Sequence, residues 1–417
     1  MTLRRVVVTG LGALTPIGLD VPAYWDGLVN GVSGCATITN LDITKLKTKI
    51  ACQLKGFDIS KHMDRKEAKR QDLFSQYAMV AAAEAMADAA IDLEKIDKYR
   101  AGVIWSSGIG GLSVFEEEVT AFAKGDGTPR FNPFFIPKMI ADIAAGHISM
   151  KYGLCGPNYA AVAACASSTI SLIDAFNFIR LNKADIMVAG GSEAAVTYSG
   201  IGGFSSMKAM SERNDDPATA SRPYDKDRDG FVLGEGAGAL VLESLDHALA
   251  RGAKIYCELA GGALTADAYH LTAPHPEGLG VIKVMEFALQ DAEMSADQID
   301  YVNTHGTSTP LGDVAELKAI EKVFGEQAYK MNISSTKSMT GHLLGAAGAI
   351  EAIATVLAIK NDIVPPTINN FNLDPEIDPR LNLTLNKAQH RTVRAAVSNT
   401  FGFGGHNAAA IFKKYEG

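Results

Sequence analysis

Short apolar stretches alternate along the chain with longer helix-like segments, and each apolar stretch ends at a turn rich in glycine or serine. The strand-like stretches cover residues 6–9, 102–106, 185–189, 239–242, 301–303 and 395–397. Helix-like segments cover residues 74–90, 168–180, 280–292 and 345–360. This alternation predicts an α/β fold in which a largely parallel sheet is covered by helices.

The chain has 417 residues, which at about 150 residues per domain suggests two or three domains or one large fold. Two sequence patterns occur twice in the chain and favour an internal duplication. Residues 15–18 (Thr-Pro-Ile-Gly) and 309–312 (Thr-Pro-Leu-Gly) each follow a predicted strand, and an apolar strand, a loop and a small-residue helix occur both around Cys165 and around residues 337–360. We therefore predict two similar halves, residues 1–258 and 259–417.

The net charge disfavours one class of partner, although a local basic patch remains open, and the cysteine content indicates the compartment. The formal net charge of -8 argues against a nucleic-acid-binding surface, which would be basic. Five scattered cysteines without a Cys-x-x-Cys pair indicate a reducing compartment. The N-terminus runs directly into the first predicted strand, so we expect no signal peptide and a cytoplasmic location.

One uncharged segment, residues 152–173, is long enough to span a bilayer. It contains a Gly-Pro-Asn turn at 156–158 and a cluster of hydroxyl side chains at 167–169. A buried strand, turn and helix fits this pattern better, and we expect no membrane span.

Two segments begin like known ligand-binding loops, one for dinucleotides and one for calcium, but their later residues do not match those motifs. Gly10 and Gly12 follow a strand as in a dinucleotide-binding loop, but Thr15 occupies the third glycine position. Residues 225–230 open like a calcium loop, but the twelfth position is Gly236, and Glu235 falls one residue early. We interpret residues 225–230 as a turn held by charge pairs.

Cys165 lies between an apolar stretch and a predicted helix. A lone cysteine is usually an inert core residue. A cysteine at a helix N-terminus, however, faces the positive end of the helix dipole and free N–H groups, which lower its pKa. This position favours a nucleophile.

Two histidines downstream lie in glycine-flanked turns after predicted strands: His305 precedes Gly306, and His342 follows Gly341. Either could be a structural hydrogen-bonding residue, but together they indicate a functional site. Metal binding is a further use of a histidine pair. No carboxylate or cysteine stands at helical ligand spacing to them, so we predict no metal.

Four motifs, well separated along the chain, together resemble those of a known protein family. They lie at residues 164–167, 305–310, 337–342 and 401–405. Together with residues 222–236, they resemble the β-ketoacyl-acyl carrier protein synthases, and most closely those of the KAS II type. The resemblance implies a thiolase-like five-layer αβαβα sandwich built from two similar halves. It also implies decarboxylative condensation of malonyl-acyl carrier protein with a cysteine-bound acyl chain, which elongates fatty acids by two carbons.

The same resemblance assigns catalytic roles. Cys165 is implied to be the acyl-accepting nucleophile, while His305 and His342 contact the malonyl thioester oxygen as enolate charge develops. Lys337 and Glu351 are similar to the supporting ion pair of the family. A solvated helix face is the alternative for Glu351, the only charged residue between 345 and 359.

Substrate-binding positions also follow from the resemblance. The backbone N–H groups of Cys165 and Phe403 are implied to form an oxyanion hole, and Phe403 resembles a gate between the acyl pocket and the malonyl site. Ile109 and Phe204 resemble residues of the acyl-pocket wall, with a plain core role as the alternative for both. The remaining implied substrate-binding residues are Phe401, Thr307 and Thr309. We assign no role to His406.

The resemblance further implies partners. Lys66, Lys69 and Arg70 match a basic helix that docks the acidic acyl carrier protein, and the helical spacing of residues 65–70 would place basic side chains on one face. No cofactor of its own is implied, because the substrates arrive on the 4′-phosphopantetheine arm of the carrier. The apolar residues 134–136, flanked by prolines, resemble a dimer contact, and we expect a homodimer.

Three alternatives remain. A degradative thiolase shares the fold but needs a second, C-terminal cysteine, and no cysteine follows Cys257. A non-enzymatic chain-length factor would lack the nucleophile, whereas Cys165 and both histidines are present. A ketosynthase of an aromatic polyketide pathway or another specialised acyl-chain pathway uses the same machinery, and the sequence does not separate it from the fatty-acid enzyme.

Overall fold

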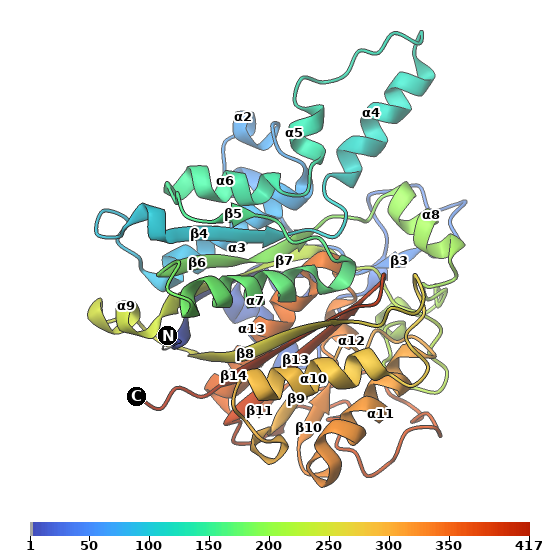
Figure 1. The fold of residues 1–417 in the computed structure, drawn as a ribbon. Coiled ribbons are helices and arrows are strands. Elements are labelled where there is room, and N and C mark those ends of the chain that lie inside the picture. The colour runs from blue at the N-terminus through green and yellow to red at the C-terminus, as the bar shows by residue number, and fades with distance from the viewer. Residues whose placement is uncertain (1–2) are drawn as a thin grey trace.

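The computed structural model describes residues 3–417, and its framework is a ten-stranded sheet made of two five-stranded halves (Figure 1). In spatial order, the N-terminal half contains β5 (Asn158–Tyr159), β4 (Ala101–Ser106), β6 (Ile186–Glu193), β7 (Gly236–Ser244) and β1 (Val6–Leu14). The C-terminal half contains β10 (Asn332–Ser334), β9 (Tyr301–Asn303), β13 (Ala395–Gly402), β14 (His406–Lys413) and β8 (Cys257–Ala266).

The two halves share one topology. In each, the first three strands of the spatial order pair in parallel and the last two pair antiparallel. The halves join where β1 pairs antiparallel with β8 over three residues. The prediction of two similar halves is confirmed, but the prediction of a largely parallel sheet is wrong. The sheet is mixed because β7 and β14 each run antiparallel to both neighbours. β14 returns from β13 through a tight turn, whereas β7 follows β6 after a long connection that contains α8.

Helices form the remaining layers. The central layer contains α7 (Ser167–Arg180) and α13 (Ala347–Asn361), each of which contacts strands of both halves. On one outer face, α3 (Leu73–Ala89) packs on β1 and β7, and α6 (Ile143–Tyr152) packs on β4. On the other, α10 (Leu279–Asp291) packs on β8 and β14, with α11 (Gly312–Phe324) beside it. These layers form the predicted αβαβα sandwich.

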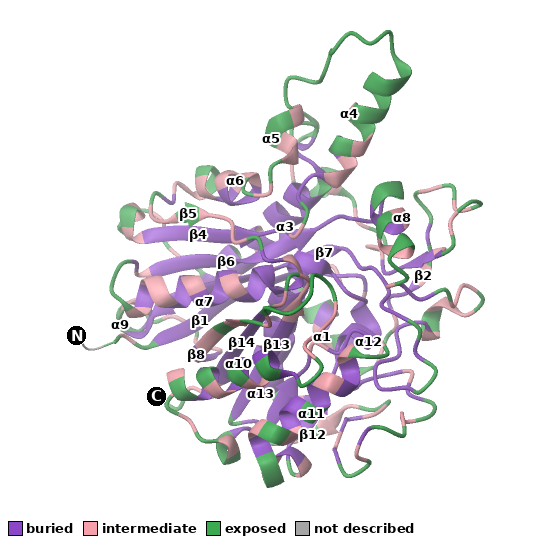
Figure 2. Cartoon of the chain, turned by 45° about the vertical axis from the view of Figure 1, so that its right-hand side comes forward, coloured by how far each residue is buried: buried purple, intermediate pink, exposed green. Residues whose placement is uncertain are grey.

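Shorter helices and strands lie outside these five layers or between their elements. They are α1 (Val21–Val29), α2 (Arg65–Ala68), α4 (Leu112–Lys124), α5 (Phe135–Met139), α8 (Tyr198–Ser206), α9 (Leu245–Ala250), α12 (Lys337–Thr340), β2 (Ala36–Thr37), β3 (Ile50–Ala51), β11 (Ile363–Val364) and β12 (Gln389–His390). α4 and α5 project from the body of the molecule, and their surface is mostly exposed (Figure 2).

The two central helices begin in the same way. A 3₁₀ turn, η3 (Ala164–Ala166), leads into α7, and another, η7 (Leu344–Ala346), leads into α13. The first residue of each turn has a positive φ, 48° for Ala164 and 47° for Leu344. Both turns lie between the third and fourth strands of their half in chain order. The similarity between the segment around Cys165 and residues 337–360 therefore reflects the duplication.

The other repeated pattern, Thr-Pro-Ile-Gly and Thr-Pro-Leu-Gly, is coincidental. Residues 15–18 follow β1, the first strand of its half in chain order, whereas residues 309–312 follow β9, the second strand of the other half. The division after residue 258 stays a prediction. β8 begins at Cys257, and residues 251–256 connect α9 to β8.

The apolar segments fill the interior. Residues 152–173 form the end of α6, β5, η3 and the start of α7, close to the strand, turn and helix predicted for them. The segment 344–361 is long and apolar enough to cross a membrane, but 89% of it is buried within the protein, as expected for the core helix α13.

Glycine lets β1 and α3 approach closely, and this contact provides a test of the packing. A Cβ added at Gly12 would lie 2.0 Å from the carbonyl oxygen of Ala81, whereas a Cβ added at Gly203 on α8 would meet nothing within 4 Å. Overpacking of this kind costs about 1–3 kcal/mol. We expect Gly12→Ala to lower the free energy of unfolding by at least that amount, as measured by urea denaturation.

Gly203→Ala is the matched control. Because alanine favours a helix interior over glycine by about 0.5–1 kcal/mol, this variant should be at least as stable as the wild type. Equal stability of the two variants would contradict the close packing of β1 on α3.

Candidate active site

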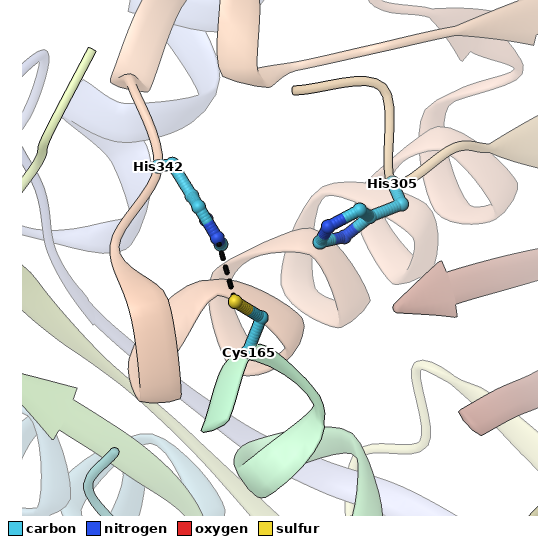
Figure 3. Close-up of side chains that lie close together, drawn as sticks. All are labelled: Cys165, His305 and His342. Atoms are coloured by element: carbon cyan, nitrogen blue, oxygen red, sulfur yellow. Dashed lines mark hydrogen bonds between the residues drawn. The ribbon is translucent and has the colours of Figure 1, made fainter. Parts of the chain in front are cut away.

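Three side chains from distant parts of the chain meet at the junction of the two halves (Figure 3). Cys165 is the middle residue of η3, His305 follows β9, and His342 follows α12. The Sγ atom of Cys165 lies 3.0 Å from Nε2 of His342. The imidazole of His305 stands perpendicular to that of His342, with ring centroids 5.3 Å apart. The structure thus brings together the three residues predicted to carry the chemistry.

Burial controls the charge state of the thiol. It raises the pKa of Cys165 to about 11, although the ammonium of Lys337 and the backbone N–H groups of Phe403 and Cys165 act in the opposite direction. The sequence-based expectation of a lowered pKa is therefore wrong, because loss of water outweighs the helix N-terminus. Cys165 is a neutral thiol that can donate its proton to Nε2 of His342.

Both imidazoles are neutral as well. Burial lowers the pKa of His305 and of His342 well below the usual value, and the charge of Lys337 lowers both further. Each neutral ring carries one N–H donor and one acceptor nitrogen. The site can accept a proton from sulfur and can also donate hydrogen bonds to an oxygen that gains charge.

Lys337 and Glu351 form a buried ion pair. The Nζ of Lys337, on α12, lies 2.5 Å from Oε1 of Glu351, on α13, and both side chains are almost fully buried. Burial raises the pKa of Glu351 to about 7, against the opposing influence of Lys337. The alternative of a solvated helix face is wrong for Glu351, since the helix lies in the central layer.

Glu316, on α11, fixes the backbone around His305. Its carboxylate accepts hydrogen bonds from the N–H groups of His305 (2.9 Å) and Gly306 (2.8 Å). Burial raises its pKa to about 7. Sequence reasoning missed Glu316, because a glutamate on an amphipathic helix resembles any solvated residue; its closeness to residue 305 in the sequence was the only available signal.

Cys165, His305 and His342 also form a cluster that could hold a metal ion, since their ligand atoms all lie within 4.8 Å of one another. The cluster contains no carboxylate. The positive charge of Lys337, which already disfavours protonation of both rings, would also disfavour a cation there. A thiol and imidazole pair is the arrangement that this electrostatic environment supports.

A cavity of about 530 Å³ opens beside the thiol. All six predicted substrate-binding residues line it: Phe403, Phe401, Thr307, Thr309, Ile109 and Phe204. The hydroxyl oxygens of Thr307 and Thr309 lie 3.2 Å apart. Phe204 packs near Phe403, with ring centroids 6.5 Å apart. The plain core alternative is wrong for Ile109, whose side chain is 40% exposed at the cavity.

The predicted docking residues lie outside this cavity. α2 ends at Ala68, so Lys69 caps the helix and Arg70 follows it. The expected longer helix is thus wrong, but Lys66, Lys69 and Arg70 are all exposed. The guanidinium of Arg70 stacks over the ring of Phe134 at 5.3 Å.

The 225–230 segment is the predicted turn held by charge pairs. The guanidinium of Arg228 bonds to Asp374 and to the carbonyl oxygens of Thr309 and Pro310. Asp225 accepts hydrogen bonds from backbone N–H groups of residues 371 and 372. These contacts hold the loop that carries the cavity threonines.

Comparison with known proteins identifies the class to which this fold and site belong. Residues 3–248 match the N-terminal domain of β-ketoacyl synthases, and residues 256–371 match their C-terminal domain. The chain belongs to the β-ketoacyl synthase family.

Particular relatives refine this assignment. Over 413 residues, the chain is 48% identical to the 3-oxoacyl-[acyl-carrier-protein] synthase 2 of Synechocystis sp., with 99% of each protein covered. A β-ketoacyl synthase structure from Burkholderia phymatum is 35% identical, with a TM-score of 0.92, and covers 99% of this chain and 100% of that one. A type II polyketide ketosynthase, solved in complex with its acyl carrier protein, is 34% identical, with a TM-score of 0.90 and the same coverage.

The neutral thiol gives a testable pH dependence. Only the thiolate is alkylated rapidly, so the iodoacetamide reaction of Cys165 should keep accelerating as the pH rises from 7 towards its pKa of about 11. The rate is measured by peptide mass spectrometry of Cys165, with the exposed Cys155 in the same sample as an internal control. A Cys165 rate that is already constant above pH 7 would contradict the buried neutral thiol.

Proposed function

We propose that the protein is a 3-oxoacyl-[acyl-carrier-protein] synthase of type II, which condenses malonyl-acyl carrier protein with an acyl chain held on Cys165. The observation that carries the proposal is the meeting of one thiol and two neutral imidazoles beside a mostly apolar cavity. A thiol and a base load the acyl chain, while two neutral N–H donors serve decarboxylation.

In the first step, the acyl group moves from the carrier to Cys165. The thiol proton passes to Nε2 of His342, 3.0 Å away, as sulfur attacks the thioester carbonyl. The backbone N–H groups of Cys165 and Phe403 stabilise the oxyanion. The carrier thiolate leaves and takes up the proton, so the histidine returns to its neutral form.

In the second step, malonyl-carrier protein occupies the site and its carbon–carbon bond to the carboxylate breaks. CO₂ leaves, and the electron pair stays on the thioester as an enolate. Once Cys165 is acylated it no longer donates to His342, and the neutral ring holds its one proton on Nε2, the nitrogen that faces Cys165. This N–H and an N–H of His305 bind the enolate oxygen. The enolate carbon then attacks the acyl thioester, and Cys165 departs as the thiolate. The thiolate takes up one proton from solvent, which balances the negative charge left behind when CO₂ departs as a neutral molecule.

A ketosynthase of a polyketide or another specialised pathway is the second candidate, because it shares this site. The observation that favours the fatty-acid enzyme is the 48% identity to the Synechocystis synthase over nearly the full length of both proteins, against 34% to the polyketide ketosynthase. An elongation assay separates them: one condensation per saturated acyl chain supports the proposal, and repeated condensation without reduction supports the polyketide alternative.

Acyl carrier protein is the proposed partner, and no cofactor beyond its 4′-phosphopantetheine arm is proposed. The polyketide ketosynthase similar to this chain was solved in complex with its carrier protein. The exposed basic residues Lys66, Lys69 and Arg70 supply charge complementary to an acidic carrier. All five cysteines are free thiols, in keeping with the proposed cytoplasmic location.

A homodimer is the proposed assembly. β5 lies at the end of the sheet beside β4. Nearby, the projecting α4–α5 region exposes apolar side chains, among them Phe131 (38%), Phe134 (40%) and Ile136 (54%). An edge strand and an exposed apolar patch are features that association with a second copy would cover.

Substitution of His305 should affect malonyl decarboxylation and acylation of Cys165 to different extents. We expect His305→Ala to slow malonyl decarboxylation by about 100-fold or more, because it removes one donor to the enolate oxygen. Acylation of Cys165 should be slowed less, since His305 does not contact the thiol. Decarboxylation is followed by CO₂ release and acylation by intact-protein mass spectrometry. Normal decarboxylation by the variant would refute the role of His305.

Charge reversal tests the docking residues. Lys69→Glu with Arg70→Glu should raise KM for carrier-borne substrates about three- to tenfold, because two complementary surface contacts become repulsive. Turnover of a small pantetheine thioester should not change. Lys330→Glu with Lys360→Glu, two exposed lysines of the C-terminal half, is the matched control. Equal losses on both substrates would show that α2 supports the fold instead.

Sedimentation velocity tests the assembly. The wild type should sediment as a dimer at micromolar concentration, and Phe134→Glu with Ile136→Glu should shift it towards the monomer, because two charges would be buried in the interface. A wild type that sediments as a monomer would refute the homodimer.

A further inference from the structure

A further buried carboxylate, in addition to Glu351 and Glu316, lies close enough to the nucleophile to act on its pKa, and the mechanism above does not use it. Glu193 is the last residue of β6 and is fully buried. Its Oε1 accepts hydrogen bonds from Oγ of Ser107 (2.8 Å) and from N–H of Ile109 (3.3 Å). Its Oε2 accepts hydrogen bonds from N–H of Gly108 (2.7 Å) and of Gly345 (2.9 Å). One side chain therefore receives four donors.

These donors belong to two segments that border the cavity from different halves of the molecule. Gly108 and Ile109 lie in the loop after β4, and Leu344 belongs to η7; all three line the cavity. The segments approach so closely that a Cβ added at Gly345 would lie 2.1 Å from the nitrogen of Gly108. Both backbones point N–H groups into this contact, and Glu193 supplies the acceptors that hold them together.

The duplication makes the position of Glu193 informative. Gly345 is the middle residue of η7, as Cys165 is the middle residue of η3. Glu193 thus binds the backbone N–H of the residue that corresponds to the nucleophile in the other half. One copy of the turn presents a thiol to the substrate, and the other anchors the cavity wall to a carboxylate.

A carboxylate is the group that this site requires. Its two oxygens can accept all four donors and it has no N–H of its own, whereas a glutamine would point an NH₂ group at backbone N–H groups. Burial raises the pKa of Glu193 to about 7, with the four hydrogen bonds opposing the shift.

We propose that Glu193 is a positioning residue that fixes Ile109 and the acyl-pocket wall beside Cys165, and thereby determines how well long acyl chains are accepted. The inference rests on the proposed function, because it takes the cavity beside Ile109 as the acyl pocket. A long chain must pass this wall to reach its bound position, whereas an acetyl group does not.

Single-turnover transfer to Cys165 tests this role with decanoyl- and acetyl-carrier protein as donors. In Glu193→Gln, the decanoyl-to-acetyl rate ratio should fall about 10- to 100-fold, the effect expected from losing charge-assisted hydrogen bonds. Malonyl decarboxylation should stay near the wild-type rate, because it does not use the acyl pocket. Circular dichroism establishes that the variant is folded.

Ser107→Ala provides a second, milder variant in case Glu193→Gln does not fold. It removes one donor to Oε1 without a change of charge, and the same ratio should fall about three- to tenfold. Glu84→Gln is the matched control. Glu84, on α3, also accepts two backbone hydrogen bonds, from Ala13 and Val21, but does not line the cavity, so its substitution should leave the ratio unchanged.

Two results would overturn the inference: an unchanged ratio in folded Glu193→Gln or Ser107→Ala, or an equal loss with both donors and in decarboxylation. A failure of the proposed function would look different, since the wild type itself would then accept neither acyl group. The wild-type reactions therefore separate the two failures.

Discussion

The ammonium group of Lys337 lies fully buried among the ionisable side chains of the active site, and its charge acts on all of them. It pairs with Glu351, disfavours protonation of both histidines and partly offsets the effect of burial on the Cys165 thiol. An unpaired charge at this depth would cost several kcal/mol. The pair is therefore kept together, and the charge of Lys337 adds to the burial that keeps the two imidazoles neutral.

The duplicated architecture explains how such a site can be assembled. α7 and α13 run through the central layer, and the turns that precede them bring residues 165 and 342–345 to one place. The cavity threonines and His305 come from the loop after β9, Phe401 comes from the end of β13, and Phe403 comes from the turn between β13 and β14. No single half contains a complete site, because the thiol belongs to one half and both imidazoles to the other.

Much of this was predictable from the sequence, and the exceptions have physical causes. Cys165, His305 and His342 stand in glycine-flanked or small-residue turns, which mark them clearly. β8 and β14 were missed because β8 is rich in alanine and glycine and β14 is rich in alanine, residues with low strand propensity that are tolerated here by burial. The thiol pKa was predicted in the wrong direction, because sequence position reveals a helix N-terminus but not the loss of water around it.

The buried carboxylates were the hardest feature to predict. Glu193 and Glu316 look like ordinary polar residues in the sequence, and their roles depend on backbone N–H groups brought to them by tertiary packing. Lys337 and Glu351 were found only through the family resemblance. Spacing along the chain does not reveal that α12 and α13 place these two side chains 2.5 Å apart.

The most direct test of the account is the site of acylation. Incubation with acyl-carrier protein, followed by peptide mass spectrometry, should place the acyl group on Cys165, and Cys165→Ala should remain unlabelled and lose condensation entirely, because both half-reactions pass through this thioester. An acyl group on another cysteine, or condensation without any acyl-enzyme, would contradict the account.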